Sequence, residues 1–342
     1  MLRSRFFTVV AAILFMSLAA FAQQDDDVLI VDVEGRLTSG RPNFDGTWRL
    51  GIRSYQGRFD SDVTTRDPGW NTLGSGSPAM PAGAAAPPPD TDLEWDFLPM
   101  KISGLAANLF FWNGAGAVSF GPTPGDDYEL FLQSKSSGFI AADGSAALVS
   151  GAVIDDTDSI GALHRHRFWF LDDGDGNMSA DPADGIYLVA LRTRMEGLDR
   201  SRPLFFAFRT LSASGAALDQ VQTWVDAVLN ELAPDFAADF DGDLDVDQND
   251  LQNWMLGYGA SGAAALQTSG DATFDQTIDG VDLLQWQRQF GSQMASFPGV
   301  APPALSGIEQ VPEPGSLVLM AGSCLALLSM RSKRGLSCLN LQ

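Results

Sequence analysis

The chain has 342 residues, enough for two domains together with their targeting segments. Its 43 acidic residues against 21 basic ones give a formal net charge of −22 at pH 7. This charge argues against nucleic-acid binding, which uses basic surface, and it is typical of a soluble exported protein or of one that collects cations.

The first 22 residues have the pattern of a secretory signal peptide. Arg3 and Arg5 precede an apolar stretch over residues 6–18, and Ala20 and Ala22 are small residues where signal peptidase inspects the chain. Cleavage after Ala22 would accompany export. An uncleaved membrane anchor is the alternative, although the apolar stretch is short for a membrane span.

Residues 24–210 are predicted to form one β-rich domain. Short apolar or alternating runs recur between clusters of Gly, Pro, Asp and Ser, a pattern typical of strands joined by turns. The predicted fold class is therefore mainly β, with a β-sandwich or jelly roll as the expected architecture. Residues 64–92 contain three consecutive prolines and are predicted to form a long loop. The expected strands are residues 28–33, 48–53, 109–112, 118–120, 128–133, 147–154, 164–171, 185–192 and 204–208.

The hydrophobic period then changes from two to 3.6 residues. Leu218, Val221 and Val225 lie on one face of an amphipathic helix predicted over residues 216–233, and Pro234 ends it. We interpret this helix as a packed connector without chemistry of its own.

Two acidic stretches follow, at residues 239–250 and 271–282. Each places oxygen-bearing side chains at positions 1, 3, 5, 9 and 12, the spacing with which a tight loop surrounds a hard cation, so calcium is the predicted cofactor. The apolar residues at position 8, Val246 and Ile278, are expected to pair the two loops back to back. The predicted ligands are Asp239, Asp241, Asp243, Asp247 and Asp250 in the first loop, and Asp271, Thr273, Asp275, Asp279 and Asp282 in the second.

The repeat continues into a short amphipathic helix after each loop. Leu251 and Trp254 recur 32 positions later as Leu283 and Trp286, as 239 recurs at 271. A duplicated calcium loop followed by a single helix resembles the type I dockerin repeat pair, over residues 235–293. The resemblance implies a calcium-stabilised α-helical module that attaches to a cohesin-like protein.

The sequence departs from the pattern of that family in three places. Loop position 6, where the sharp turn usually requires Gly, is Leu244 in the first loop and Gln276 in the second. Position 3 of the second loop is the neutral Thr273, so the first loop is predicted to bind calcium more tightly.

Positions 10 and 11, which the resemblance assigns to cohesin contact, differ between the loops, and a single binding orientation is expected. A solvated acidic loop without metal is the alternative.

Two further groups of metal-ligating residues are left open. Residues 173–184 carry the same oxygen spacing on an expected hairpin, and either calcium or a plain turn would fit. His164 and His166 are two apart on an expected strand, so their rings could meet one metal, but the sequence offers no third ligand. We favour inward-facing histidines of a core strand, with Phe168 and Phe170 continuing the face. The oxygen-bearing residues of the acidic segment are Asp173, Asp175, Asn177, Asp181 and Asp184.

The C-terminal part reads as a linker, residues 294–310, and a sorting tail. The motif Val311, Pro312, Glu313 and Pro314, the apolar residues 317–330 and a basic end together resemble the PEP-CTERM sorting signal over residues 311–335. The resemblance implies recognition by an exosortase-type enzyme, cleavage near the motif and membrane contact through the C-terminal segment alone. A permanent C-terminal membrane anchor is the alternative. Cys324 and Cys338, the two cysteines, both lie in this tail.

Motifs of common enzyme classes are absent from the sequence. It contains no Gly-x-Ser-x-Gly elbow, phosphate-binding loop or His-Glu-x-x-His motif, and no catalytic residue is predicted. We therefore predict an exported, calcium-stabilised, non-catalytic protein of the cell envelope or surface. One alternative is a carbohydrate-binding module for extracellular polysaccharide, with Trp70, Trp95 or Trp112 exposed on a flat face. The other is a polysaccharide hydrolase with paired carboxylates in a groove.

Overall fold

The computed structural model of the chain describes residues 27–43, 45–61, 63–174, 182–233 and 235–293. The predicted signal peptide, the linker and the sorting tail with Val311–Pro314 lie outside these residues. Among the helices that are described, none combines the length and the apolar character needed to cross a membrane.

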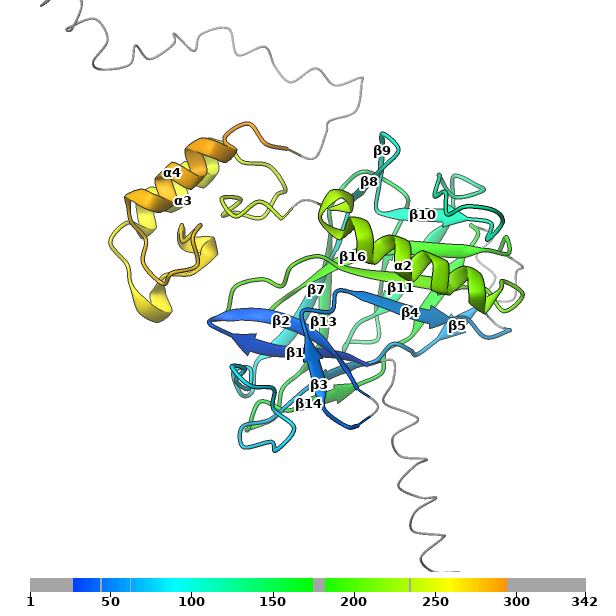
Figure 1. Cartoon of the computed structure of the whole chain (residues 1–342), viewed down its shortest axis with the longest axis horizontal. Coiled ribbons are helices and arrows are strands. Elements are labelled where there is room, and N and C mark those ends of the chain that lie inside the picture. Colours follow the sequence, from blue (N-terminus) through cyan, green and yellow to red (C-terminus); the bar gives the residue numbers. More distant parts are fainter. Residues whose placement is uncertain (1–26, 44, 62, 175–181, 234, 294–342) are drawn as a thin grey trace, which may run out of the picture. The chain divides into compact units, whose positions relative to one another are not determined.

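The described chain is mainly β, as the sequence predicts (Figure 1). Its strands form sheets of six, five, four and two strands. The six-stranded sheet contains β13 (Val149–Asp156), β7 (Asp92–Leu98), β16 (Ile186–Arg194), β17 (Leu204–Arg209) and β4 (Ser54–Arg58) in this order, with β10 (Leu109–Trp112) paired to β16. The five-stranded sheet has the order β14 (Leu163–Arg165), β6 (Trp70–Thr72), β1 (Val28–Val33), β2 (Arg36–Pro42) and β3 (Trp48–Leu50). The four-stranded sheet has the order β12 (Phe139–Ala142), β11 (Glu129–Gln133), β15 (Trp169–Asp172) and β5 (Thr64–Thr65), and β8 (Met100–Ile102) pairs with β9 (Leu105–Ala107).

Strand β16 explains why the core has two parts. It is buried from Ile186 to Thr193, so its sequence is a continuous apolar run instead of an alternating one. Successive side chains of a strand point to opposite faces. Tyr187 and Val189 join a cluster that includes residues of β1, β6, β11 and β15, whereas Leu188 joins a second cluster on the other face.

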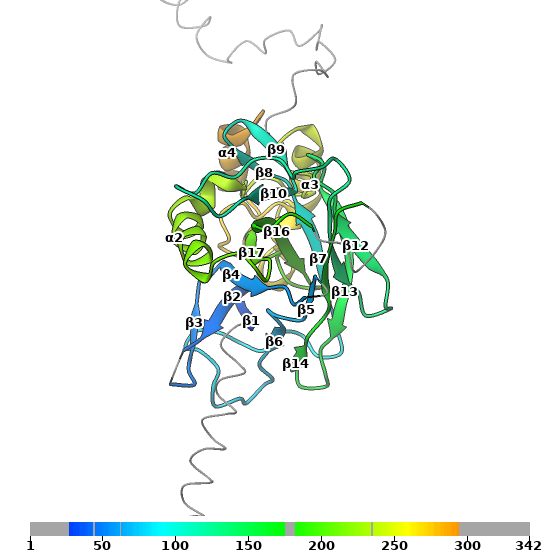
Figure 2. The ribbon, with the colours of Figure 1, turned by 90° about the vertical axis from the view of Figure 1, so that its right-hand side faces the viewer.

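Helix α2 (Gly215–Leu232) covers that second face, as Figure 1 and Figure 2 show. It occupies the segment where the sequence predicts a helix, and it packs against β17 and β4. Its apolar stripe, including Leu218, Val221 and Val225, is buried in the second cluster. The stripe is therefore used for packing, and the helix has a structural role.

Four predictions in the β domain are wrong. Residues 118–120, predicted as a strand, belong to none of the strands that the structure describes. Residues 64–92, predicted as a loop, contain β5 and β6, and the side chain of Trp70 in β6 is fully buried. Strands of two and three residues are too short for their hydrophobic period to be visible. The strand expected at residues 164–171 is divided into β14 and β15, which belong to different sheets. Because β15 and β16 also belong to different sheets, the acidic segment 173–184 connects two sheets and is not the tip of a hairpin.

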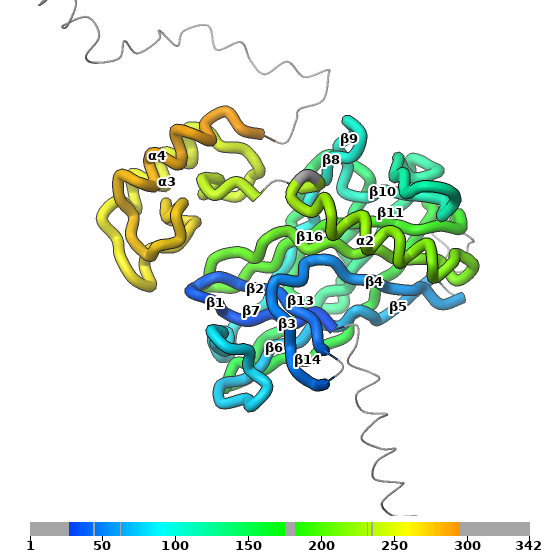
Figure 3. Tube along the Cα trace, in the orientation of Figure 1, coloured from blue at the N-terminus to red at the C-terminus, as the bar shows by residue number. Residues whose placement is uncertain are grey.

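Helices α3 (Gln248–Gly257) and α4 (Gly280–Gln289) follow the two acidic loops and lie side by side (Figure 3). Each begins with a capping box, in which Asp247 or Asp279 accepts a backbone hydrogen bond and the Asp three residues later accepts one in return. Short 3₁₀ turns at Gly262–Ala264 (η1) and Gln267–Ser269 (η2) join the two units. The core between them is small and includes Phe240, Val246, Trp254 and Trp286.

The two loops do not pair with each other, which corrects the expected contact between Val246 and Ile278. The backbone of Val246 bonds to Gly291 and Ser292 after α4, and that of Ile278 bonds to Gly259 and Ala260 after α3. The indole N–H groups also bond from the helix of one repeat to the loop of the other. Trp254 donates to the carbonyl oxygen of Asp279 at 3.0 Å, and Trp286 donates to that of Asp247 at 2.9 Å. Each loop is thus held by the helix of the other repeat.

Candidate metal sites

The first acidic loop brings its predicted ligands together in two groups. Carboxylate oxygens of Asp239, Asp241 and Asp243 lie within 4.8 Å of one another, and those of Asp245, Asp247 and Asp250 do the same. The sequence prediction omitted Asp245, because position 7 of such a loop usually contributes only its backbone carbonyl. An acidic residue at a backbone-ligand position is the signal that could have revealed it.

Burial is the main cause that raises the pKa of Asp239, Asp241, Asp245 and Asp250, and the neighbouring carboxylates act in the same direction. Burial raises the pKa of Asp239 to about 6, although Arg200 and Arg192 act in the opposite direction. Burial, followed by the charges of Asp243 and Asp250, raises the pKa of Asp241 to about 6. A hard cation at this position would compensate the clustered negative charge.

The loop backbone makes the sharp turn that such a site requires. Asp239 accepts hydrogen bonds from the backbone nitrogens of Gly242 at 2.6 Å and Leu244 at 3.2 Å, and Asp250 accepts one from Phe240 at 2.6 Å. Leu244, at position 6, has a φ of +74°, and its counterpart Gln276 has a φ of +63°. Both loops therefore keep the left-handed turn that usually falls to Gly, at a cost of roughly 1–2 kcal/mol each for a residue with a side chain.

The second loop has the same backbone pattern but different chemistry. Asp271 accepts a hydrogen bond from the backbone nitrogen of Gln276 at 2.8 Å, and Asp282 accepts one from Thr273 at 3.0 Å. The Thr273 hydroxyl also donates to Asp282 at 3.0 Å, so position 3 of this loop supplies a neutral oxygen where the first loop has the carboxylate of Asp241. Asp275 and Asp279 accept backbone hydrogen bonds from Thr277 and Val281, respectively.

Two buried arginines of the β domain hold the first loop by its backbone. Arg192 donates to the carbonyl oxygen of Gly242 at 2.6 Å and to Asp96 at 3.2 Å. Arg200 donates to the carbonyl oxygen of Asp239 at 2.8 Å. These arginines were not predicted as part of the site, since they lie about 40 residues or more before the loop. Arg192 near the end of β16 and Arg200 in the connection to β17 are a weak signal for such a role.

The burial of Leu244 explains why a leucine stands at loop position 6, where Gly is usual. Its side chain is 7% exposed and belongs to the same hydrophobic cluster as β16 and α2. The apolar contact offsets the backbone strain of the left-handed turn. Gln276 is exposed and has no comparable burial. The first loop is therefore joined to the β domain through one leucine and two arginines.

Of the five candidate ligands in the acidic segment 173–184, the structure describes Asp173 and Asp184. Asp175, Asn177 and Asp181 lie outside the described residues. Asp184 accepts a hydrogen bond from the hydroxyl of Thr210 at 2.9 Å, a contact that joins the start of β16 to the end of β17. Asp173 lies at the end of β15, in the connection between two sheets.

The two histidines do not face the core, which corrects the expected inward orientation. The side chain of His164 is 56% exposed and that of His166 is 29% exposed, whereas Leu163, Trp169 and Leu171 are the core residues of this segment. The division of the predicted strand into β14 and β15 breaks the continuous face on which the prediction depended. Both rings lie next to the buried Asp27.

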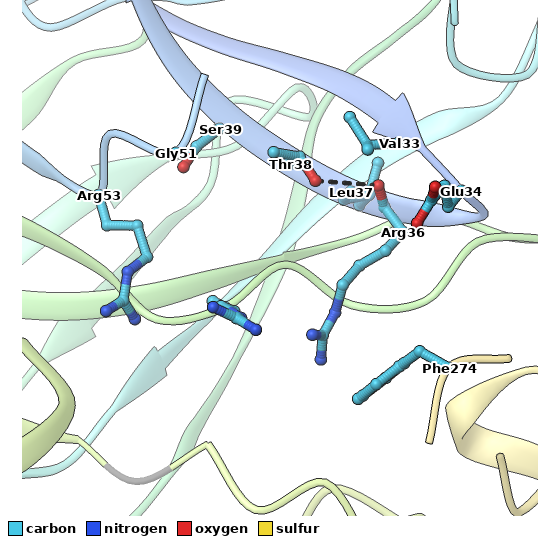
Figure 4. Close-up of a pocket in the computed structure, with 10 residues that line it drawn as sticks. Val33, Glu34, Arg36, Leu37, Thr38, Ser39, Gly51, Arg53 and Phe274 are labelled. Carbon is cyan, nitrogen blue, oxygen red and sulfur yellow. Dashed lines mark hydrogen bonds between the residues drawn. The ribbon is translucent and has the colours of Figure 1, made fainter. Parts of the chain in front are cut away.

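The tryptophans proposed as a carbohydrate platform are buried. Trp70 and Trp95 are 0% exposed and Trp112 is 3% exposed, so none of them is available to a sugar ring. A different feature could bind a polar ligand. A pocket of about 310 Å³ is lined by Arg36, Arg53, Arg202 and the ring of Phe274, among others (Figure 4). The guanidinium of Arg36 lies 4.2 Å from the centroid of the Phe274 ring.

Comparison with known proteins assigns no family. No family model matches the chain, and no curated protein matches it. Among solved structures, the chain is similar to a family 123 glycoside hydrolase from Clostridium perfringens, with 10% identity and a TM-score of 0.18. The similarity covers 48% of this chain, and this chain spans only 24% of the length of the hydrolase. A likeness at this level assigns neither fold nor function.

Proposed function

We propose that the protein is an exported, calcium-stabilised, non-catalytic protein of the cell envelope or surface. In this proposal a β-sandwich domain carries a dockerin-like repeat pair at residues 235–293. The observation that supports it best is the first acidic loop. Its carboxylates gather in two groups of three, each with ligand atoms within 4.8 Å of one another, while its backbone is held by Arg192 and Arg200. Calcium is then a structural ion that fixes the repeat pair against the β domain.

Attachment to a partner is the role proposed for the repeat pair. Gln248 and Asn249 are exposed at the start of α3, and Val281 is 54% exposed at the start of α4. Leu256 and Met255 on α3 are 86% and 63% exposed, respectively. Exposed apolar side chains on a helix are typical of protein–protein contact surfaces. A cohesin-like protein would be the partner of this surface.

The targeting segments supply the location in this proposal. Residues 1–22 direct export, and an exosortase-type enzyme recognises Pro312–Pro314 and removes the tail. The mature protein then lacks both cysteines, so bound calcium takes the stabilising role that disulfides have in many exported proteins. These segments lie outside the described residues, and the proposal for them depends on the sequence.

We expect the mature protein from its native cells to have lost both ends. Its intact mass should correspond to a chain that begins at Gln23 and ends near Pro314, because both signals are cleaved during export and sorting. Intact-mass spectrometry measures this directly. A mature chain that still contains Cys324 would contradict cleavage of the tail and would favour a permanent anchor.

A second candidate function is the binding of an acidic extracellular polysaccharide in the arginine-lined pocket. Guanidinium groups bind carboxylate and sulfate oxygens through directed hydrogen bonds, and the Phe274 ring offers an apolar face. This pocket replaces the buried tryptophans as the basis for carbohydrate binding. Three arginines and one glutamate, Glu34, line the pocket, and Arg36 and Arg202 also pair with Asp235 beside it.

Arg202→Ala should weaken binding of a uronic-acid polysaccharide about tenfold or more, because a charge-assisted hydrogen bond contributes roughly 1.5–3 kcal/mol. The Arg202 side chain is 60% exposed, so the substitution should leave the fold intact. Arg49→Ala is the matched control, since Arg49 is exposed on β3 and does not line the pocket. Isothermal titration calorimetry provides the affinities. Equal affinity in both variants would exclude the pocket.

A further inference from the structure

A second group of metal-ligating side chains lies at the edge of the five-stranded sheet, apart from the acidic loops. Asp27 directly precedes β1, His164 belongs to β14, and His166 directly follows β14. Strand β6 lies between β1 and β14 in the sheet. The pairing of β6 with both neighbours therefore brings together residues that are more than 130 positions apart in the sequence.

The strand register explains how these side chains meet. Trp70 pairs with Val28 on one side and with Arg165 on the other, so one step earlier Gly69 lies between Asp27 and His166. A Cβ atom at Gly69 would lie 2.6 Å from Cε1 of His166 and 2.7 Å from Oδ1 of Asp27. Gly69 does not have a positive φ, so it is needed for its missing side chain. Only Gly lets the carboxylate and the imidazole approach each other across β6.

The ligand atoms of the three side chains lie close together, with the two oxygens of Asp27 facing different histidines. Nε2 of His164 lies 3.1 Å from Nε2 of His166 and 3.2 Å from Oδ2 of Asp27. Nε2 of His166 lies 3.6 Å from Oδ1 of Asp27. Zinc bonds of roughly 2.0–2.1 Å with tetrahedral angles place neighbouring ligand atoms about 3.3 Å apart. One ligand atom from each of the three residues lies within 4.8 Å of the other two, which is close enough for all three to reach one ion.

Hydrogen bonding fixes the tautomer of His166 in the form that a metal requires. Its Nδ1 lies 3.0 Å from Oδ1 of Asp67 and 3.2 Å from the carbonyl oxygen of Arg66, and both of these atoms are acceptors. The proton of the neutral ring therefore resides on Nδ1, and the lone pair of Nε2 points at Asp27 and His164. A carboxylate on the outer nitrogen of a histidine is typical of metal ligands.

Without a cation, this arrangement is electrostatically incomplete. Asp27 is 1% exposed, and the side chains that act on its charge are the two imidazoles, Asn71 and the carboxylate of Asp67. The lone pair of Nε2 of His166 would face a buried carboxylate oxygen. A buried carboxylate is stable when it is paired with a positive charge or coordinates a metal.

We propose that Asp27, His164 and His166 bind one divalent transition metal ion, with Zn²⁺ as the ion that fits best, at a site separate from the acidic loops. Two imidazoles and one carboxylate match the ligand preference of zinc, whereas calcium takes oxygen ligands. The fourth position faces solvent on the side of the exposed His164 ring and holds water or an oxygen of a ligand. The ion ties the first described residue, Asp27, to β14.

Zinc titration of the metal-free full chain tests this site. The chain carries Cys324→Ser and Cys338→Ser, because thiolates also bind zinc, and excess calcium is present to fill the acidic loops. We expect one zinc ion per chain by competition with a chromophoric chelator, and the visible absorption of a tetrahedral ion when Co²⁺ replaces Zn²⁺. Zinc should also raise the unfolding temperature.

Two variants and a control separate coordination from folding. His164→Gln should weaken zinc binding about 100-fold or more, and Asp67→Ala should weaken it roughly 10–100-fold through the loss of the outer hydrogen bond. Asp90→Asn, at an exposed aspartate elsewhere, should leave the affinity unchanged. The proposal is overturned if the parent chain binds no stoichiometric zinc, if calcium displaces the zinc, or if folded His164→Gln binds zinc as tightly as the parent.

Discussion

Removal of calcium from the full chain with a chelator should lower its unfolding temperature by about 10 °C. A ligand at 1,000 times its dissociation constant stabilises the folded state by about 4 kcal/mol, and each kcal/mol corresponds to roughly 2–4 °C for a protein of this size. The loss should be large because the repeat pair has a small core of its own, and the empty loop leaves Asp239, Asp241 and Asp243 crowded together. Differential scanning calorimetry with calcium and with chelator measures the shift.

Equivalent substitutions in the two loops identify which loop causes the calcium-dependent shift in unfolding temperature. Asp250→Asn should remove most of the calcium-dependent shift, whereas Asp282→Asn should remove less of it. Both residues occupy position 12, are 0% exposed and complete a capping box, so the two variants differ mainly in the loop that they disable. The second loop is expected to be the weaker one, because its position 3 is the neutral Thr273 where the first loop has Asp241. Equal unfolding temperatures with calcium and with chelator in the parent chain would reject calcium stabilisation.

Gly242→Ala should destabilise the protein by about 3–5 kcal/mol. Gly242 has a φ of +82°, which costs a residue with a side chain roughly 1–2 kcal/mol. Its added Cβ would also overlap the guanidinium of Arg200. Arg200 would have to leave the carbonyl oxygen of Asp239, and loss of a buried hydrogen bond from a charged group adds roughly 1.5–3 kcal/mol.

Gly259→Ala is the control for backbone strain alone. Gly259 has a φ of +88°, and a Cβ atom there would meet nothing within 4 Å. This variant should cost about 1–2 kcal/mol, so the difference between the two variants measures the contact with Arg200. Urea unfolding of both variants, each with saturating calcium, gives the two free energies. Similar costs would mean that Arg200 does not hold the loop.

The parts of the fold that could be predicted are those whose signal is local. The 18-residue helix α2 shows its period within its own sequence, and β16 is a long apolar run bounded by turn residues. Strand β6 has three residues, and its burial comes from pairing with β1 and β14. Nothing within residues 70–72 indicates that they form the middle of a sheet.

The same limit applies to the sites. The spacing of Asp239 and Asp250 within one loop points to a cation, because the loop itself brings its ligands together. Arg192 and Arg200 reach that loop only through the fold, and Asp27 meets His166 only because Gly69 separates them in the sheet. The sequence offers no third ligand close to His164 and His166, because Asp27 lies far from them in the chain and reaches them only through the strand order of the sheet.

The burial of Leu244 in the β domain bears on the portability of the repeat pair. A module that is exchanged between proteins needs a surface that is complete without its neighbour. In this chain, transfer of residues 235–293 to another protein would expose Leu244 and would leave the carbonyl oxygens of Asp239 and Gly242 without their arginine donors. Residues 235–293 therefore depend on the β domain for part of their burial and hydrogen bonding, and a substitution on one side of this contact affects the other side.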